Sequence, residues 1–185
     1  MKRNLFLITL LCPGFLFGSI ELSISAENVV GTADLGTTFS QFVKKIQYDR
    51  INKTEDDWKI YKDGKVIMYI HDKGNGDLIV RSINILSPSI ITTNGLHVGM
   101  SVDEFLKKCP NAKLEMSDMT GAEYFSPDEL QTYTRDGTYD SISHLYVESN
   151  DKKLLGTGNF SDYPTANYRK NGSIRFISIY RWGGD

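Results

Sequence analysis

The chain has 185 residues, of which 24% are charged and 11% are aromatic, and its formal net charge is −2 at pH 7. A mildly acidic chain lacks the positive field that attracts nucleic acid, so we expect no nucleic-acid partner. Two cysteines are too few for a disulfide framework, which leaves a hydrophobic core to hold the fold.

The first 26 residues have the order of a secretory signal peptide. Lys2 and Arg3 are followed by an apolar run at 5–11 and by small residues that end at Ala26. This order predicts export and cleavage after Ala26. The alternative is a retained membrane anchor, but proline and glycine interrupt the run before it reaches the roughly 20 apolar residues of a spanning helix.

Cys12 lies inside this segment and is a poor candidate for a lipid anchor. Leu11 is not the small residue that usually precedes a lipidated cysteine, and Pro13 follows it. We therefore expect no lipidation, while peripheral association with a membrane stays open. Removal of the segment changes the net charge from −2 to −3 and leaves Cys109 alone, so we expect residues 27–185 to form one domain without an internal disulfide.

The first helix signal after the expected cleavage site lies at residues 39–46. Four apolar residues recur at positions i, i+3, i+4 and i+7, after two threonines that can serve as N-caps. These residues are Phe39, Phe42, Val43 and Ile46. The spacing predicts a short amphipathic helix packed on a core.

An antiparallel meander is expected next. The Asp-Gly pair at 63–64 separates β-prone runs at 58–62 and 65–71, and such a pair suits a type I′ turn, which needs positive φ at both positions. A second turn at 74–77 leads into a third expected strand at 78–86.

The middle of the chain predicts a capped helix from Ser101 to Cys109. Ser101 and Glu104 fit a capping box, and Pro110 bars continuation. Cys109 falls on the apolar face at the C-terminal end, where the helix dipole disfavours a thiolate. We therefore expect a buried thiol, and not a Cys/His pair with His97.

Two further strands are expected at 141–148 and 173–182, separated and preceded by long segments at 149–172 and 115–140. In the last strand, simple alternation places Ile174, Phe176, Tyr180 and Trp182 on one face and Ile177 and Ile179 on the other. The long segments are rich in aromatic residues, which predicts ordered excursions that pack on the sheet or project from it. The expected fold is α+β, a mainly antiparallel twisted sheet with two short helices packed on it.

Candidate binding residues cluster in the later excursion. Tyr and Arg are residue types that anchor protein interfaces. The alternative, which we weigh equally, is that these side chains only cover a face of the sheet. The candidates are Tyr163, Tyr168 and Arg169, together with Leu155, Asn159 and Phe160 at an expected loop tip. We expect no cofactor and no metal, because the three histidines are far apart and show no zinc-ligand spacing.

The string from Leu78 to Leu106, LIVRSINILSPSIITTNGLHVGMSVDEFL, resembles the family of bacterial envelope lipoproteins under sigma-E (RpoE) control. An early short helix, a meander before Leu78 and a final strand ending at Trp182 agree with that family in order. The resemblance implies a protein associated with envelope stress. The family has no established molecular function and supplies no catalytic residues.

These patterns together predict an exported, non-catalytic binding protein of the bacterial periplasm. Its expected partner is an envelope or secreted protein, or a cell-wall component. One alternative is an inhibitor or immunity protein that acts on a cell-wall hydrolase or another toxin. The other is a hydrolase that uses His144 or His71 with a loop carboxylate.

Overall fold

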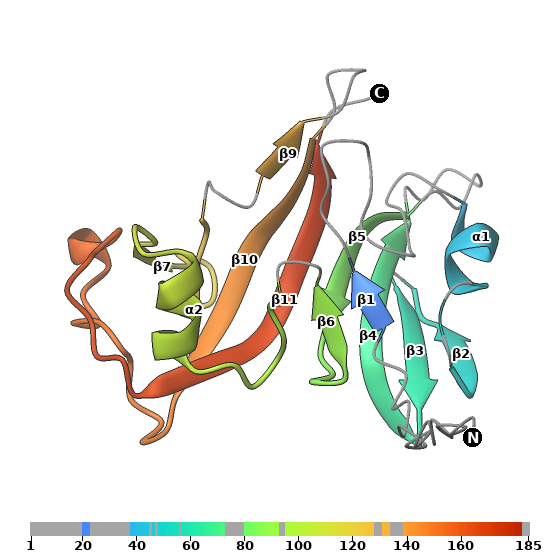
Figure 1. Cartoon of the computed structure of the whole chain (residues 1–185), viewed down its shortest axis with the longest axis horizontal. Coiled ribbons are helices and arrows are strands. Elements are labelled where there is room, and N and C mark those ends of the chain that lie inside the picture. Colours follow the sequence, from blue (N-terminus) through green and yellow to red (C-terminus); the bar gives the residue numbers. More distant parts are fainter. Residues whose placement is uncertain are drawn as a thin grey trace, which may run out of the picture.

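A computed structural model describes residues 20–22, 38–44, 46, 48–55, 57–72, 80–92, 95–127, 131–133 and 139–182 (Figure 1). Most of the expected signal peptide and the expected turn at 74–77 lie outside the described residues. Ile20–Leu22, within the expected signal peptide, forms strand β1 and pairs in parallel with β6 (Ile90–Thr92). Among the described helices, none has the length and apolar character needed to cross a membrane.

A single antiparallel sheet dominates the described part of the chain. It contains nine strands in the order β2-β3-β4-β5-β11-β10-β8-β7, and β9 pairs with β10 beside this path. Their bounds are β2 Arg50–Lys53, β3 Trp58–Lys62, β4 Lys65–Asp72, β5 Val80–Ile85, β7 Leu114–Met116, β8 Glu123–Phe125, β9 Gln131–Tyr133, β10 Tyr139–Ser149 and β11 Gly172–Trp182. The helices are α1, Phe39–Val43, and α2, Val102–Lys108, near opposite ends of the sheet (Figure 1). The predicted α+β class is confirmed.

One face of the sheet forms the core. The strand register aligns a row of fully buried side chains across seven strands. In spatial order they are Ile60, Met68, Ile85, Ile177, Leu145, Phe125 and Leu114. Both helices add to this face, since the ring of Phe105 in α2 lies 4.9 Å from that of Phe125, and Phe39 in α1 stacks on Trp58 at 4.2 Å.

The capping signals behave as the sequence predicts. Ser101 and Glu104 exchange hydrogen bonds through side chain and backbone, with N–O distances of 3.0 and 3.2 Å. Cys109 follows α2 with 1% of its surface exposed, which confirms the buried thiol. Helix α1 is also capped, by Thr38, but it ends at Val43 and is shorter than expected.

The Asp63–Gly64 turn is also confirmed, with φ of 51° and 72° at its two central positions. The expectation that residues 115–140 form a long excursion is wrong in part. This segment contains β8 and β9 and the end of β7, and all three strands join the sheet. Single-sequence patterns miss such three-residue strands because long-range pairing, and not local propensity, creates them.

A bulge in β11 overturns the simple alternation expected for the last strand at Ile174, whereas Ile177 and Ile179 are buried together as expected, and a second bulge lies in β10. The register skips Ser143 on β10 and Arg175 on β11. Because an extra residue reverses the alternation beyond it, Ile174 is buried in the core with Ile177, and Phe176 is only partly buried.

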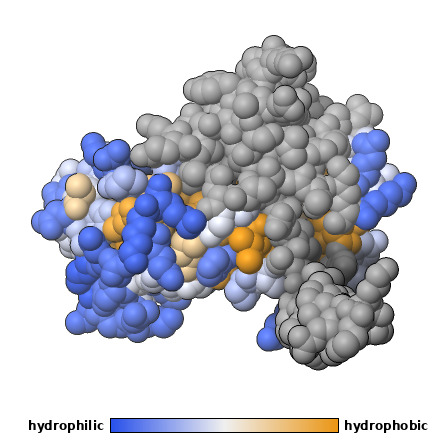
Figure 2. Space-filling model, viewed as in Figure 1, coloured by the Kyte–Doolittle hydropathy of each residue, from blue (hydrophilic) through white to orange (hydrophobic). Residues whose placement is uncertain are grey.

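In the view of Figure 2, the surface on the left is mainly hydrophilic, and apolar residues show there as a narrow band. The left of this view contains α2, β7 and the segment that follows β10 (Figure 1). On the face that this view shows, the residues of this half are therefore mostly polar.

Candidate functional site: an aromatic hollow on the outer sheet face

The sheet face opposite the core carries a second cross-strand row. Glu115 pairs with Tyr124, Tyr124 with Tyr146, and Tyr146 with Phe176, across β7, β8, β10 and β11. Each of these residues directly neighbours a core residue in its strand, and successive side chains of a strand point to opposite faces. The row therefore lies on the face turned away from the helices.

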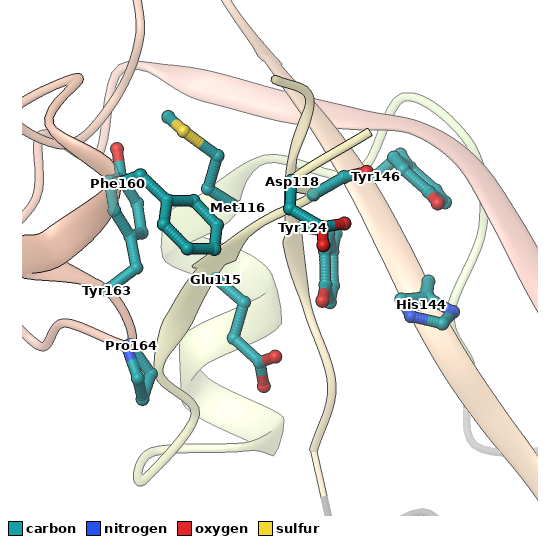
Figure 3. A pocket seen from close by; sticks show the side chains of 10 residues that line it. Glu115, Met116, Asp118, Tyr124, His144, Tyr146, Phe160, Tyr163 and Pro164 are labelled. Atoms are coloured by element: carbon teal, nitrogen blue, oxygen red, sulfur yellow. The ribbon is translucent and has the colours of Figure 1, made fainter. Parts of the chain in front are cut away.

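A hollow of about 410 Å³ opens over this row. Its floor comes from Glu115, Tyr124, His144 and Tyr146, and the turn after β7 and the chain at 160–164 contribute walls (Figure 3). We call this feature the aromatic hollow. Strand β7 is the last strand on this side of the sheet, and two backbone hydrogen bonds of 2.9 Å between Leu114 and Thr165 fasten the loop against it.

The rings of the floor are packed against one another. Tyr146 stacks on Phe176 with centroids 4.1 Å apart and an interplanar angle of 17°. Tyr124 meets His144 edge to face at 4.4 Å and lies 5.5 Å from Tyr146. Such contacts fix ring orientation in advance, which lowers the entropy lost when a ligand binds.

The electrostatics of the floor are negative. Partial burial raises the pKa of Tyr124 to about 12, and the nearby carboxylates of Glu115, which accepts its hydrogen bond, and Asp118 reinforce the shift. Burial lowers the pKa of His144, so its ring is neutral at pH 7. No positive charge from His144 therefore offsets the two carboxylates at neutral pH.

A buried carboxylate holds the loop that forms one wall. Glu123 on β8 is 4% exposed and accepts hydrogen bonds from Leu155 N at 2.5 Å, Gly156 N at 2.7 Å and the Tyr163 hydroxyl at 2.6 Å. Burial, followed by this contact with Glu123, raises the pKa of Tyr163 to about 12. A Cβ at position 156 would lie 2.4 Å from the Tyr163 hydroxyl oxygen, so any other residue there would displace the Tyr163 side chain.

Glu123 was not among the sequence candidates, because its partners lie more than thirty residues away along the chain. Leu155 was expected to contact a partner at a loop tip, and this expectation is wrong. Its side chain is 1% exposed and belongs to the core. Its backbone N–H donates to Glu123, and its side chain packs in the core.

The exposed part of this loop lies further on. Phe160, in the 3₁₀ helix Phe160–Asp162, is 55% exposed and lines the rim of the hollow beside Tyr163 (Figure 3). Asn159 is exposed next to it. Met119, which directly follows the lining residue Asp118, is 90% exposed. Phe160 is therefore a large apolar side chain that is exposed to water at the hollow.

The other two sequence candidates fasten the loop and do not line the hollow. Tyr168 packs its ring 5.3 Å from that of Phe125 and donates a hydrogen bond to the Ala112 carbonyl at 3.2 Å. Arg169 donates to Asp151 at 2.7 Å and to the Leu154 carbonyl, and the first of these bonds holds the Asp151 pKa well below its usual range. Of the six candidates, Tyr163 and Phe160 line the hollow.

His71 lies on β4, in a separate polar chain across the sheet. Its Nδ1 lies against the Asp57 carboxylate, and its Nε2 is 3.4 Å from the amide nitrogen of Asn84. The Asn84 oxygen accepts a hydrogen bond from Ser178 at 2.5 Å. Within the described residues, no group of three or more metal-ligating side chains gathers.

A second hollow, of about 740 Å³, lies between the β3–β4 turn and residues 86–91. None of its described lining residues is aromatic, and its charged lining residues, Lys62, Asp63 and Lys65, are of both signs. Five of its ten described lining residues are apolar, so it lacks the aromatic and acidic lining of the first hollow.

No family model matches the chain, and no curated protein matches it. The chain is similar to a solved structure, that of the uncharacterized protein yfeY from Escherichia coli. The TM-score is 0.50 at 14% sequence identity, and the match covers 89% of this chain and 99% of that one. This likeness shows a shared fold across nearly the whole length of both chains.

Proposed function

We propose that the protein is an exported, non-catalytic binding protein of the bacterial envelope, and that it binds its partner at the aromatic hollow. The order of residues 1–26 supports export, and the string at 78–106 supports a role similar to that of the sigma-E-regulated envelope lipoproteins. The partner is an envelope or secreted protein, or a cell-wall component.

The observation that carries this proposal is Phe160 at the rim of the hollow. A phenylalanine that is 55% exposed sits on a loop whose base is tied down by three hydrogen bonds to Glu123. The fold thus holds an apolar anchor in water at a defined position, and burial of this ring by a partner would be favourable.

An inhibitor or immunity protein is a specific form of this proposal. Phe160 and Met119 are both exposed on segments that contribute lining residues to the hollow, and pre-organised inhibitor interfaces change little on binding. A partner of this kind would be a cell-wall hydrolase or another toxin.

A hydrolase that uses His144 or His71 is the competing class. A general base needs a ring nitrogen within reach of its substrate. Both ring nitrogens of His71 face side chains of the protein itself, those of Asp57, just before β3, and Asn84 on β5. His144 is packed among Tyr124, Tyr146 and Tyr180, an arrangement that suits an aromatic floor.

The test is an affinity capture from a bacterial envelope extract with the wild-type protein and with Phe160→Ala. Tyr48→Ala serves as the matched control, because Tyr48 is also exposed, at 41%, but precedes β2 at the opposite edge of the sheet. We expect a partner that is lost with Phe160→Ala and retained with Tyr48→Ala. Equal capture by both variants, or a hydrolytic activity abolished by His144→Ala, would overturn the proposal.

A further inference from the structure

We propose that the aromatic hollow recognises an organic cation, such as a protonated amine or a trimethylammonium group, carried by the ligand. This inference rests on the proposed function, because it assigns a ligand class to the same site. The charge and the ring geometry of the lining residues carry it.

The charged groups that line the hollow have one sign. Glu115 and Asp118 carry carboxylates, and no lysine or arginine is among the described lining residues. Beside burial, both carboxylates raise the pKa of the Tyr124 hydroxyl. A cation that enters the hollow meets the same field with the favourable sign, whereas an anion is repelled.

The aromatic lining favours an organic cation over a metal ion. Four six-membered aromatic rings, those of Tyr124, Tyr146, Phe160 and Tyr163, line the hollow beside the imidazole of His144 (Figure 3). Ammonium groups bind ring faces within about 6 Å of the centroid, whereas hard metal ions require several oxygen ligands. A volume of about 410 Å³ also exceeds what a single ion fills.

A neutral sugar is the competing ligand chemistry, because rings stack on sugars and carboxylates accept hydrogen bonds from hydroxyls. The two chemistries differ in how they respond to the loss of negative charge. A cation depends on the charge of Glu115 and Asp118, whereas a sugar needs only acceptor oxygens, which glutamine and asparagine retain.

The probes are choline and 3,3-dimethyl-1-butanol, its uncharged isostere of the same shape. Each is titrated at low salt into the full exported chain labelled with ¹⁵N, and amide shifts are followed at Tyr124, Tyr146 and the 160–163 segment. We expect choline to bind there at least about threefold more tightly than its isostere. Raising the salt concentration to 0.15 M should lower the affinity for choline and leave the affinity for the isostere unchanged.

The charge variant is Glu115→Gln with Asp118→Asn. Its control is Glu55→Gln with Asp103→Asn, which removes two exposed carboxylates outside the hollow. We expect choline affinity to fall about fivefold or more in the first variant and to change little in the second. The ¹⁵N spectrum reports whether each variant folds, and the salt titration needs no variant.

Equal affinity for choline and its isostere would overturn the cation inference. Amide chemical-shift changes caused by choline only outside the hollow would also overturn it. The proposed function would survive that result if envelope capture still depended on Phe160. If Phe160→Ala captured the partner as well as the wild type did, while choline still bound more tightly than its isostere, the proposed function would be contradicted and the ligand class would stand.

Discussion

Replacement of Glu123 by glutamine tests how the wall of the hollow is built. The side chain keeps its shape, but one carboxylate oxygen becomes an NH₂ group that faces backbone or hydroxyl donors. If the oxygen stays toward Gly156 and Tyr163, the Leu155 N–H has no acceptor. An unsatisfied buried amide costs about 1–3 kcal/mol, and the remaining bonds lose charge assistance worth roughly 1 kcal/mol.

We therefore expect Glu123→Gln to lower the free energy of unfolding by about 2–4 kcal/mol. For a chain of this size, that corresponds to a midpoint temperature roughly 5–15 °C lower. The measurement is urea unfolding followed by circular dichroism, with hydrogen exchange of the Leu155 and Gly156 amides. Tyr163→Phe, which removes one of the three bonds, should cost about 1 kcal/mol. Wild-type stability within about 0.5 kcal/mol, with both amides still protected, would refute the reasoning.

Three further outcomes are expected. Leu155→Ala should destabilise the protein by about 2–5 kcal/mol, because its side chain is in the core, whereas Phe160→Ala should change the stability by less than about 0.5 kcal/mol. Equal effects in urea unfolding would contradict the assignment of Leu155 to the core and of Phe160 to the surface. In an absorbance titration at 295 nm, Tyr124 and Tyr163 should ionise near pH 12 and not near pH 10. Because their folded pKa is raised, they contribute stability below pH 10 that is lost between pH 10 and 12, and a Phe variant of either should reduce that loss. Ser101→Ala should cost about 1 kcal/mol, since it removes the N-cap of α2; an unchanged unfolding midpoint would show that the cap is dispensable.

Local chemistry explains which elements were predictable from sequence. The capping box at Ser101 and Glu104 and the turn at Asp63–Gly64 are complete within four residues, so their physics is present in the sequence. The burial of Cys109 follows from helical spacing for the same reason. The end of α1 was less predictable, because Ile46 is buried as the pattern requires although the helix stops before it.

The hollow was not predictable, because it depends on register. Glu115, Tyr124 and Tyr146 come together only when β7, β8 and β10 pair in one alignment. Bulges at Ser143 and Arg175 shift the alternation along β10 and β11, and no local residue signal marked either one. Phe160 and Tyr163 were identified by residue type alone, and their place at the rim depends on the distant carboxylate of Glu123.

The central claim is that ligands contact the protein at the hollow, and site-specific photo-crosslinking tests it most directly. A benzophenone amino acid replaces Phe160 in one variant and Tyr48 in the other, and both are irradiated in intact cells. We predict a discrete crosslinked species from position 160 and none from position 48. Crosslinking at position 48 alone, or to the same extent at both positions, would contradict the claim.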